Sequence, residues 1–205
     1  MQAALRLTKA DDVPTFIRAI EGRVAALARA QTLLAADRWI SADLHALFRG
    51  GLATFLNEGG AGPWVDLQGP TVALPPGAAQ PLAIAVHELA TNALKYGALS
   101  VPAARVTITW EMVGVTRDLL RIVWTEIGGP LLKNAPTSRG FGSRVLNGTL
   151  RHQLGGTVNL DWKATGLVCV IELPLRSLNK AISVENGAWS AGEVQNLSEQ
   201  RQVNG

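Results

Sequence analysis

The sequence predicts an α+β fold, in which helices cover one face of a mixed, mostly antiparallel sheet and a helical hairpin precedes that domain. Two patterns predict it. Apolar residues recur every three or four positions early in the chain, which is typical of amphipathic helices, and they alternate with polar residues in several later segments, which is typical of half-buried strands. A Gly/Pro-rich stretch at 59–63 separates the hairpin from the rest and marks a domain boundary.

The hairpin begins with an alanine-rich helix over residues 13–34. Its apolar stripe consists of Phe16, Ile20, Val24, Leu27 and Leu34. A second helix is expected over 41–56, with Ser41 as its N-cap. Because two helices cannot close a core alone, the hairpin packs either on a second copy of the chain or on the domain that follows. We expect a homodimer.

The following domain alternates strands with helices. Strands are expected at 64–67, 71–74, 105–113, 119–125, 157–162 and 167–173. A helix over 81–97 has Pro81 at its first position and Gly97 at its C-cap, and another covers 142–154. The long segment 126–139 between them fits a functional lid. Trp39 and Trp64 are expected to anchor the core, and the polar residues 177–205 to form a disordered tail, which leaves domains at 1–58 and 59–176.

Composition excludes several classes of protein. The 205 residues are 47% hydrophobic and 17% charged, which is enough for a core. The single cysteine, Cys169, excludes a disulfide framework and suits a reducing compartment, so the cytoplasm is expected. The net charge of +3 is scattered, which does not favour nucleic acid. The most apolar stretch, 81–99, carries several polar side chains, so no membrane span is expected.

The helix over 81–97 presents a strip of chemically useful side chains. Glu88 and Asn92 stand one turn apart and Lys95 follows three residues on, so a carboxylate, an amide and an ammonium share one side. Mg²⁺ prefers oxygen ligands and keeps several waters, so one amide oxygen and nucleotide phosphates can complete its shell, while Lys95 neutralises phosphate charge. When this helix is considered alone, an ordinary exposed polar face is the favoured explanation.

Two glycine-containing clusters point the same way. Glu126 ends a strand and is followed by Gly128 and Gly129, so a carboxylate there can accept a hydrogen bond from the amine of adenine while the ring lies on bare backbone. The cluster at 139–144 opens a helix, and its amides, Arg139 and Arg144 suit an anion. Each cluster alone also fits a simple turn.

Together the three clusters resemble the ATP-binding domain of the HWE family of sensor histidine kinases. The residues that carry the resemblance are His87 in the first cluster, Trp124 and Glu126 in the second, and Gly140-Phe141-Gly142-Ser143-Arg144 in the third. The resemblance covers about residues 13–175. It implies a Bergerat-type (GHKL) α/β sandwich that binds Mg-ATP between the helix over 81–97, called the N-box helix, and a lid.

The resemblance also assigns roles to residues. Asn92 would ligate magnesium, Glu88 would place the metal or its water, and Lys95 would face phosphate. Glu126 would hold the adenine amine. His87 would stand beside the nucleotide, although a packed wall explains it equally well. The remaining nucleotide-binding residues would be Gly128, Gly140, Gly142 and Arg144.

The activity that the resemblance implies is transfer of the γ-phosphoryl group of ATP to a histidine and then to an aspartate of a response regulator, in a two-component phosphorelay. Neither His45 nor His152 stands in the family's acceptor context, and the sequence starts about ten residues after the place where that context is expected. The acceptor is therefore expected upstream or on another chain. The alternatives are a nucleotide-binding regulatory or dimerisation module without kinase activity and, less favoured, a related serine kinase.

Overall fold

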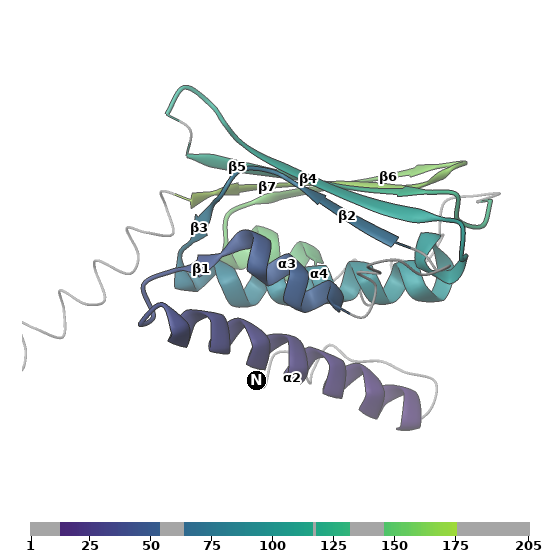
Figure 1. Ribbon diagram of the computed structural model, residues 1–205, viewed down its shortest axis with the longest axis horizontal. Helices are drawn as coiled ribbons and strands as arrows, with labels where there is room; N and C mark the ends of the chain where they lie inside the picture. The colour runs from purple at the N-terminus through teal and green to yellow at the C-terminus, as the bar shows by residue number, and fades with distance from the viewer. Residues whose placement is uncertain (1–12, 54–63, 117, 132–145, 176–205) are drawn as a thin grey trace, which may run out of the picture.

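The computed structural model describes residues 13–53, 64–116, 118–131 and 146–175. Its main sheet has the strand order β2-β4-β5-β7-β6. The strands are β2 (Trp64–Gln68), β4 (Arg105–Val113), β5 (Leu119–Ile127), β6 (Thr157–Lys163) and β7 (Gly166–Pro174). β2 and β4 run parallel and the other neighbours antiparallel. Helices cover one face of this sheet (Figure 1), so the predicted fold class is confirmed.

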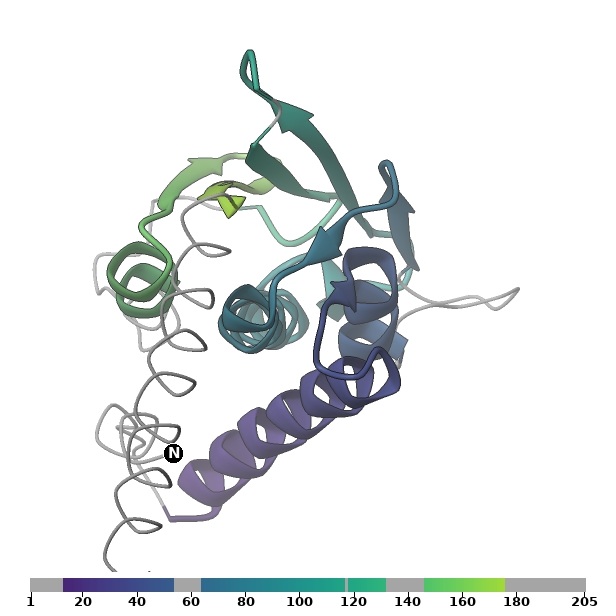
Figure 2. The ribbon, with the colours of Figure 1, turned by 90° about the vertical axis from the view of Figure 1, so that its left-hand side faces the viewer.

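The helices form two levels beneath the sheet. Figures 1 and 2 show α4 (Pro76–Tyr96) and α3 (Leu44–Leu52) next to the sheet and α2 (Val13–Ala36) outside them. One core joins all three levels, from Trp124 of β5 through Leu89 of α4 to Leu34 of α2. Of the two partners left open for the hairpin, the following domain is therefore one that it contacts. The division into domains at residue 58 stays a prediction.

The N-box helix α4 starts earlier than predicted. It begins at Pro76, with Pro75 as its N-cap, and the expected first residue, Pro81, lies inside it. Proline suits the first helical position, and Pro76 fills that place because the buried residues Ala78 and Ala79 extend the apolar side of the helix. Gly97 ends the helix as predicted, and its N–H donates to the carbonyl of Ala93.

The second helix of the hairpin begins later than predicted. The N-cap of α3 is Asp43, whose Oδ2 accepts a hydrogen bond from the Ala46 N–H at 3.0 Å, whereas Ser41 donates to Asp37. Residues 42–43 instead form β1 (Ala42–Asp43), which pairs with β3 (Ala73–Leu74) in a separate two-stranded sheet. The strand expected at 71–74 therefore does not join the main sheet.

The buried tryptophans differ from the predicted ones. Trp39 and Trp64 are 55% and 52% exposed, so the prediction that they anchor the core is wrong. Trp39 lies in the turn after α2 and Trp64 on an edge strand; of the tryptophans in the described ranges, Trp110 and Trp124 are the buried ones. Of the helix expected at 142–154, the described part is η3 (Asn147–Gln153) with the preceding Leu146. The tail at 177–205 lies outside the described residues.

Candidate functional site

The predicted strip on α4 divides between two environments. Asn92 is half-buried and Lys95 is exposed, so these two side chains line an accessible edge of the helix. Glu88, one turn earlier, is buried. The expectation of one continuous exposed strip is therefore correct for Asn92 and Lys95 and wrong for Glu88, because α2 covers the helix at that level.

Glu88 is paired with an arginine from α2. The Nε of Arg23 donates to Oε1 of Glu88 at 2.6 Å, and both side chains are only 7% exposed. A charge-assisted hydrogen bond of this kind is strong, and it compensates part of the cost of removing two charges from water. The pair therefore joins the hairpin helix to the N-box helix beside Asn92.

His87 also faces α2. A Cβ placed on Gly22 would lie 2.6 Å from Nε2 of His87, so the ring fits only because α2 presents bare backbone there. Burial lowers the pKa of His87 below its ordinary value, the positive charges of Arg23, Arg29 and Lys95 act in the same direction, and Glu88 opposes them. A packed wall against α2 accordingly describes the surroundings of this ring.

The buried carboxylate of Glu126 lies at the C-terminal end of α4 and accepts hydrogen bonds from two donors. Its Oε2 accepts a hydrogen bond from the Ala98 N–H at 2.9 Å and its Oε1 accepts one from Nε1 of Trp124 at 3.1 Å. Burial raises the pKa of Glu126, and these two hydrogen bonds oppose that rise. Gly97 makes the arrangement possible, since a Cβ there would collide with Oε2 of Glu126.

The two glycines after β5 pack on the segment that follows α4, Gly129 on Ala98 and Gly128 on Ala104. Gly129 approaches η2 (Ala98–Ser100) so closely that a Cβ would lie 2.9 Å from the Ala98 nitrogen. Gly128 has a φ of +81°, which favours glycine. The structure thus brings together the end of the N-box helix, which carries Lys95, and the cluster of Glu126 and Gly128.

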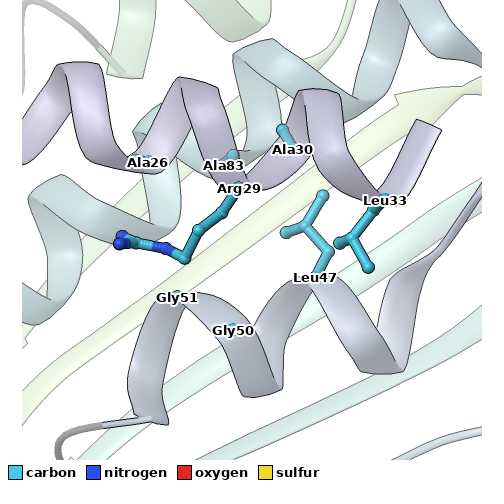
Figure 3. A pocket seen from close by; sticks show the side chains of 8 residues that line it. All are labelled: Ala26, Arg29, Ala30, Leu33, Leu47, Gly50, Gly51 and Ala83. Atoms are coloured by element: carbon cyan, nitrogen blue, oxygen red, sulfur yellow. The ribbon is translucent and has the colours of Figure 1, made fainter. Parts of the chain in front are cut away.

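The third cluster lies outside the described residues, and this includes Gly140, Gly142 and Arg144. A cavity shown in Figure 3 lies elsewhere, between α2, α3 and α4, and its volume is about 10 Å³. This is room for about one water, so the cavity is not a nucleotide site. Its lining consists of Ala26, Arg29, Ala30, Leu33, Leu47, Gly50, Gly51 and Ala83.

Sequence reasoning missed the residues that hold the predicted site in place. Arg23 replaces Val24 on the buried side of α2, and Val24 is exposed. The signal was present, because Ile20, Arg23 and Leu27 are spaced by three and four residues, as a helix stripe requires. No local pattern indicates that the Ala98 N–H reaches Glu126, since the two residues belong to different elements.

The arrangement defines a class of protein by its fold. The structure resembles the histidine kinase domain of the Erythrobacter litoralis EL346 blue-light activated histidine kinase, with a TM-score of 0.64 and 24% identity over 80% of this chain and 78% of that one. The fold is therefore that of a histidine kinase catalytic domain.

Sequence comparisons give the family. A blue-light-activated histidine kinase of Rhizobium johnstonii is 36% identical over 174 residues, which are 85% of this chain and 48% of that protein. Blue-light-activated histidine kinase 1 of Erythrobacter litoralis is 35% identical over 80% of this chain and 45% of its own length. The family model of the HWE histidine kinase matches residues 1–71. The chain belongs to the HWE histidine kinase family.

The chain spans about half the length of the curated relatives it matches. Within the described ranges, no helix combines the length and apolar character that crossing a bilayer requires. The same ranges contain no group of three or more His, Cys, Asp or Glu side chains that could hold a metal ion.

Proposed function

We propose that this chain is the ATP-dependent histidine kinase module of a two-component phosphorelay, and that it binds Mg-ATP along the open edge of α4. One observation supports the proposal. The hydrogen bond from the Ala98 N–H to Glu126 joins the end of α4 to β5, which supports a site that runs from Asn92 and Lys95 on α4 to the buried carboxylate of Glu126. A nucleoside triphosphate has the same order of chemistry along its length.

The phosphate end of this edge suits magnesium. The amide oxygen of Asn92 is a hard ligand on a half-buried side chain, and Mg²⁺ commonly takes one or two protein ligands besides phosphate and water. When bound, the ion neutralises phosphate charge in the transition state. Lys95 adds a positive charge one turn further on, and Glu88 would place the metal or its water. Gly140, Gly142 and Arg144 are proposed as the phosphate-facing loop.

The adenine end depends on the acceptor capacity of Glu126. Each carboxylate oxygen has two lone-pair directions and each accepts one hydrogen bond from the chain, so an acceptor site remains for the adenine amine. Gly128 has no side chain to separate the ring from the backbone. Since guanine has a carbonyl in place of that amine, the same group would discriminate against GTP.

The proposed reaction is phosphoryl transfer to a histidine of an upstream segment or of another chain. A ring nitrogen attacks the γ-phosphorus, the bond to the bridging oxygen breaks, ADP leaves with that electron pair, and the ring proton passes to solvent. An aspartate of a response regulator then takes the phosphoryl group. Positioning and charge neutralisation supply most of the catalysis in such transfers, which fits a site built from one amide and one ammonium.

We also propose that the chain forms a homodimer through α2. The outer side of this helix exposes Val13, Ile17 and Val24 at spacings of four and seven residues, which form one apolar line. The single cysteine, Cys169, is buried and needs no oxidising compartment, and we place the protein in the cytoplasm.

Nucleotide binding tests the site. Asn92→Ala should abolish magnesium-dependent ATP binding, measured by titration of a fluorescent ATP analogue, whereas Asn159→Ala, an exposed residue of β6, should leave it unchanged. Glu126→Ala should reduce the preference for ATP over GTP. If neither Asn92→Ala nor Glu126→Ala alters affinity, the assigned edge of α4 is wrong.

Phosphoryl transfer separates the kinase from the regulatory module. The chain is incubated with γ-labelled ATP and with a family member whose own nucleotide site is inactivated but whose acceptor histidine is intact. We expect acid-labile, base-stable label on that histidine. Tight ATP binding without label would support a binding module, and acid-stable label would indicate a serine kinase.

A further inference from the structure

Arg23 and Glu88 form a nearly dry ion pair within one helical turn of Asn92. The pair is 2.6 Å long and both side chains are 7% exposed. Arg23 belongs to α2 and Glu88 to α4, so the guanidinium reaches the N-box helix from the outer helical layer. The ion pair therefore lies where α2 contacts α4, one helical turn from the residue at which we propose that the triphosphate binds.

Stability alone is a weak reason for such a pair. Apolar side chains of similar volume commonly stabilise a fold as well as a buried ion pair does, because the two ions lose their hydration. The residues one turn away on either side of Arg23 along α2, Ala19, Ile20, Ala26 and Leu27, are apolar, so the arginine interrupts an otherwise apolar side of the helix. A guanidinium has a specific advantage only where it must bind an oxyanion in a defined geometry.

Glu88 and a terminal phosphate are both oxyanions that a guanidinium can bind. Side chains three or four residues apart on a helix have Cβ atoms about 5–6 Å apart, so a phosphate at Asn92 would lie within reach of an arginine held at Glu88.

We propose that Arg23 binds the terminal phosphate of the nucleotide, and that Glu88 is the counterion that keeps the guanidinium in place when no triphosphate is present. This inference rests on the proposed function, since it needs the phosphates at Asn92. The exchange of partners frees the Glu88 carboxylate beside the metal. It also makes α2 a wall of the nucleotide site that distinguishes ATP from ADP.

Affinities for ATP and ADP test the inference on the full chain. Arg23→Gln should weaken Mg-ATP binding about tenfold or more, the loss expected for one hydrogen bond to a charged group, while Mg-ADP binding changes little. Arg23→Lys, which keeps the charge without the fork of donors, should recover part of the loss. Displacement of a fluorescent nucleotide gives both constants without any measurement of catalysis.

Glu88→Gln is the matched control, because it breaks the same pair from the other side. If the pair only fastens α2 to α4, both variants will weaken ATP and ADP by equal factors, and the inference is overturned. If Arg23 binds phosphate, Arg23→Gln should lower the ratio of ATP affinity to ADP affinity, whereas Glu88→Gln, which keeps the guanidinium and removes its competitor, should keep or raise that ratio even where loss of the carboxylate beside the metal weakens both nucleotides.

The double variant Arg23→Gln, Glu88→Gln covers the case in which a lone buried charge unfolds the protein. It contains neither ion. It should show the ATP-specific loss of affinity of Arg23→Gln with an unchanged circular dichroism spectrum, and a loss of ATP and ADP affinity by the same factor would contradict the inference. Asn92→Ala distinguishes failure of the proposed function from failure of this inference. If Asn92→Ala retains ATP binding, the proposed function is wrong. If Asn92→Ala loses both nucleotides but Arg23→Gln leaves the ratio of ATP affinity to ADP affinity unchanged, only this inference is wrong.

Discussion

A single hydrogen atom at Gly97 determines where Glu126 can stand. The residue is the C-cap of α4 and has an extended φ of −121°, so its backbone conformation is open to any amino acid. Its need for glycine comes from the close approach of Oε2 of Glu126. The space that one side chain would occupy is thus used to join a helix end to a strand.

Gly97→Ala should therefore displace the Glu126 carboxylate or the end of α4. We expect a loss of about 1–3 kcal/mol in the free energy of unfolding, as for other overpacked sites, together with weaker ATP binding. Urea unfolding and nucleotide titration measure the two effects. Gly77→Ala in the first turn of the same helix is the control, since a Cβ there meets nothing within 4 Å. Equal behaviour of the two variants would contradict this role of Gly97.

The half-buried ring of His87 predicts a pH dependence of stability. Burial lowers the pKa of His87 in the folded chain below the ordinary value of 6.5. The unfolded chain therefore binds a proton that the folded chain resists, and the free energy of unfolding falls as the pH drops through 6.5 toward the folded pKa. His87→Gln cannot take that proton.

We expect His87→Gln to lose less stability than the wild type between about pH 7.5 and 5.5, as measured by urea unfolding at each pH. His152→Gln provides the comparison, because His152 is exposed near the end of η3. It should keep the wild-type slope. A slope for His87→Gln that is as steep as that of the wild type would show that this ring does not titrate as its burial requires.

At the scale of elements, the close packing of α2 on α4 depends on Gly22. In an ordinary helix a change from glycine to alanine adds about 1 kcal/mol of stability. Here the new methyl group would lie 2.6 Å from Nε2 of His87 and would act as a wedge between the two helices. Gly22→Ala should therefore destabilise the protein and increase hydrogen exchange along α2.

Two further variants test that explanation. Gly22→Ala combined with His87→Ala removes the ring that the methyl group meets, and it should regain the stability that the single change loses. Gly50→Ala on α3 is the matched control, because the nearest atom to its new Cβ is Cδ of Arg29 at 3.9 Å. Gly50→Ala is expected to stabilise the protein, as in an ordinary helix. If Gly22→Ala also stabilised it, the close contact between α2 and α4 would be refuted.

The elements that periodicity predicted well are those whose pattern is set by one large apolar partner. β4, β5 and β7 alternate against the helical layer, and their predicted bounds lie within about two residues of the observed ones. Ends were less predictable where two residues compete for one role, as Pro76 and Pro81 do at the start of α4. Local preference does not decide between them, because the choice depends on what the added turn buries.

The sequence predicts which residue types form the candidate site but not the contacts that hold them. Asn92, Lys95 and Glu126 were chosen from their positions on α4 and at the end of β5 and from the family resemblance, and their roles stay a prediction. The partners of Glu88 and Glu126 come from other elements, and Arg23 is 65 residues away from Glu88 in the chain. A shift of one position on α2, from Val24 to Arg23, turns the stripe by about 100° and replaces an apolar contact with an ion pair.

At the scale of the whole molecule, the layers give α2 two different sides. Its inner side contacts α3 and α4, where it meets His87 and Glu88. Its outer side lies on the surface farthest from the sheet (Figure 2) and exposes Val13, Ile17 and Val24. A partner on the outer side would therefore be separated from the proposed nucleotide site by the thickness of one helix.

A two-fold contact along this outer line is the homodimer that we propose. In such a contact each residue occurs twice, so one substitution introduces two charges into the interface. Val24→Asp should therefore convert a dimer into a monomer, measured by sedimentation equilibrium, and Ile17→Asp should do the same. Val115→Asp, which alters a fully exposed apolar residue in the turn between β4 and β5, should leave the mass unchanged. A wild-type chain that sediments as a monomer, or a Val24→Asp variant that remains dimeric, would show that α2 does not form the interface.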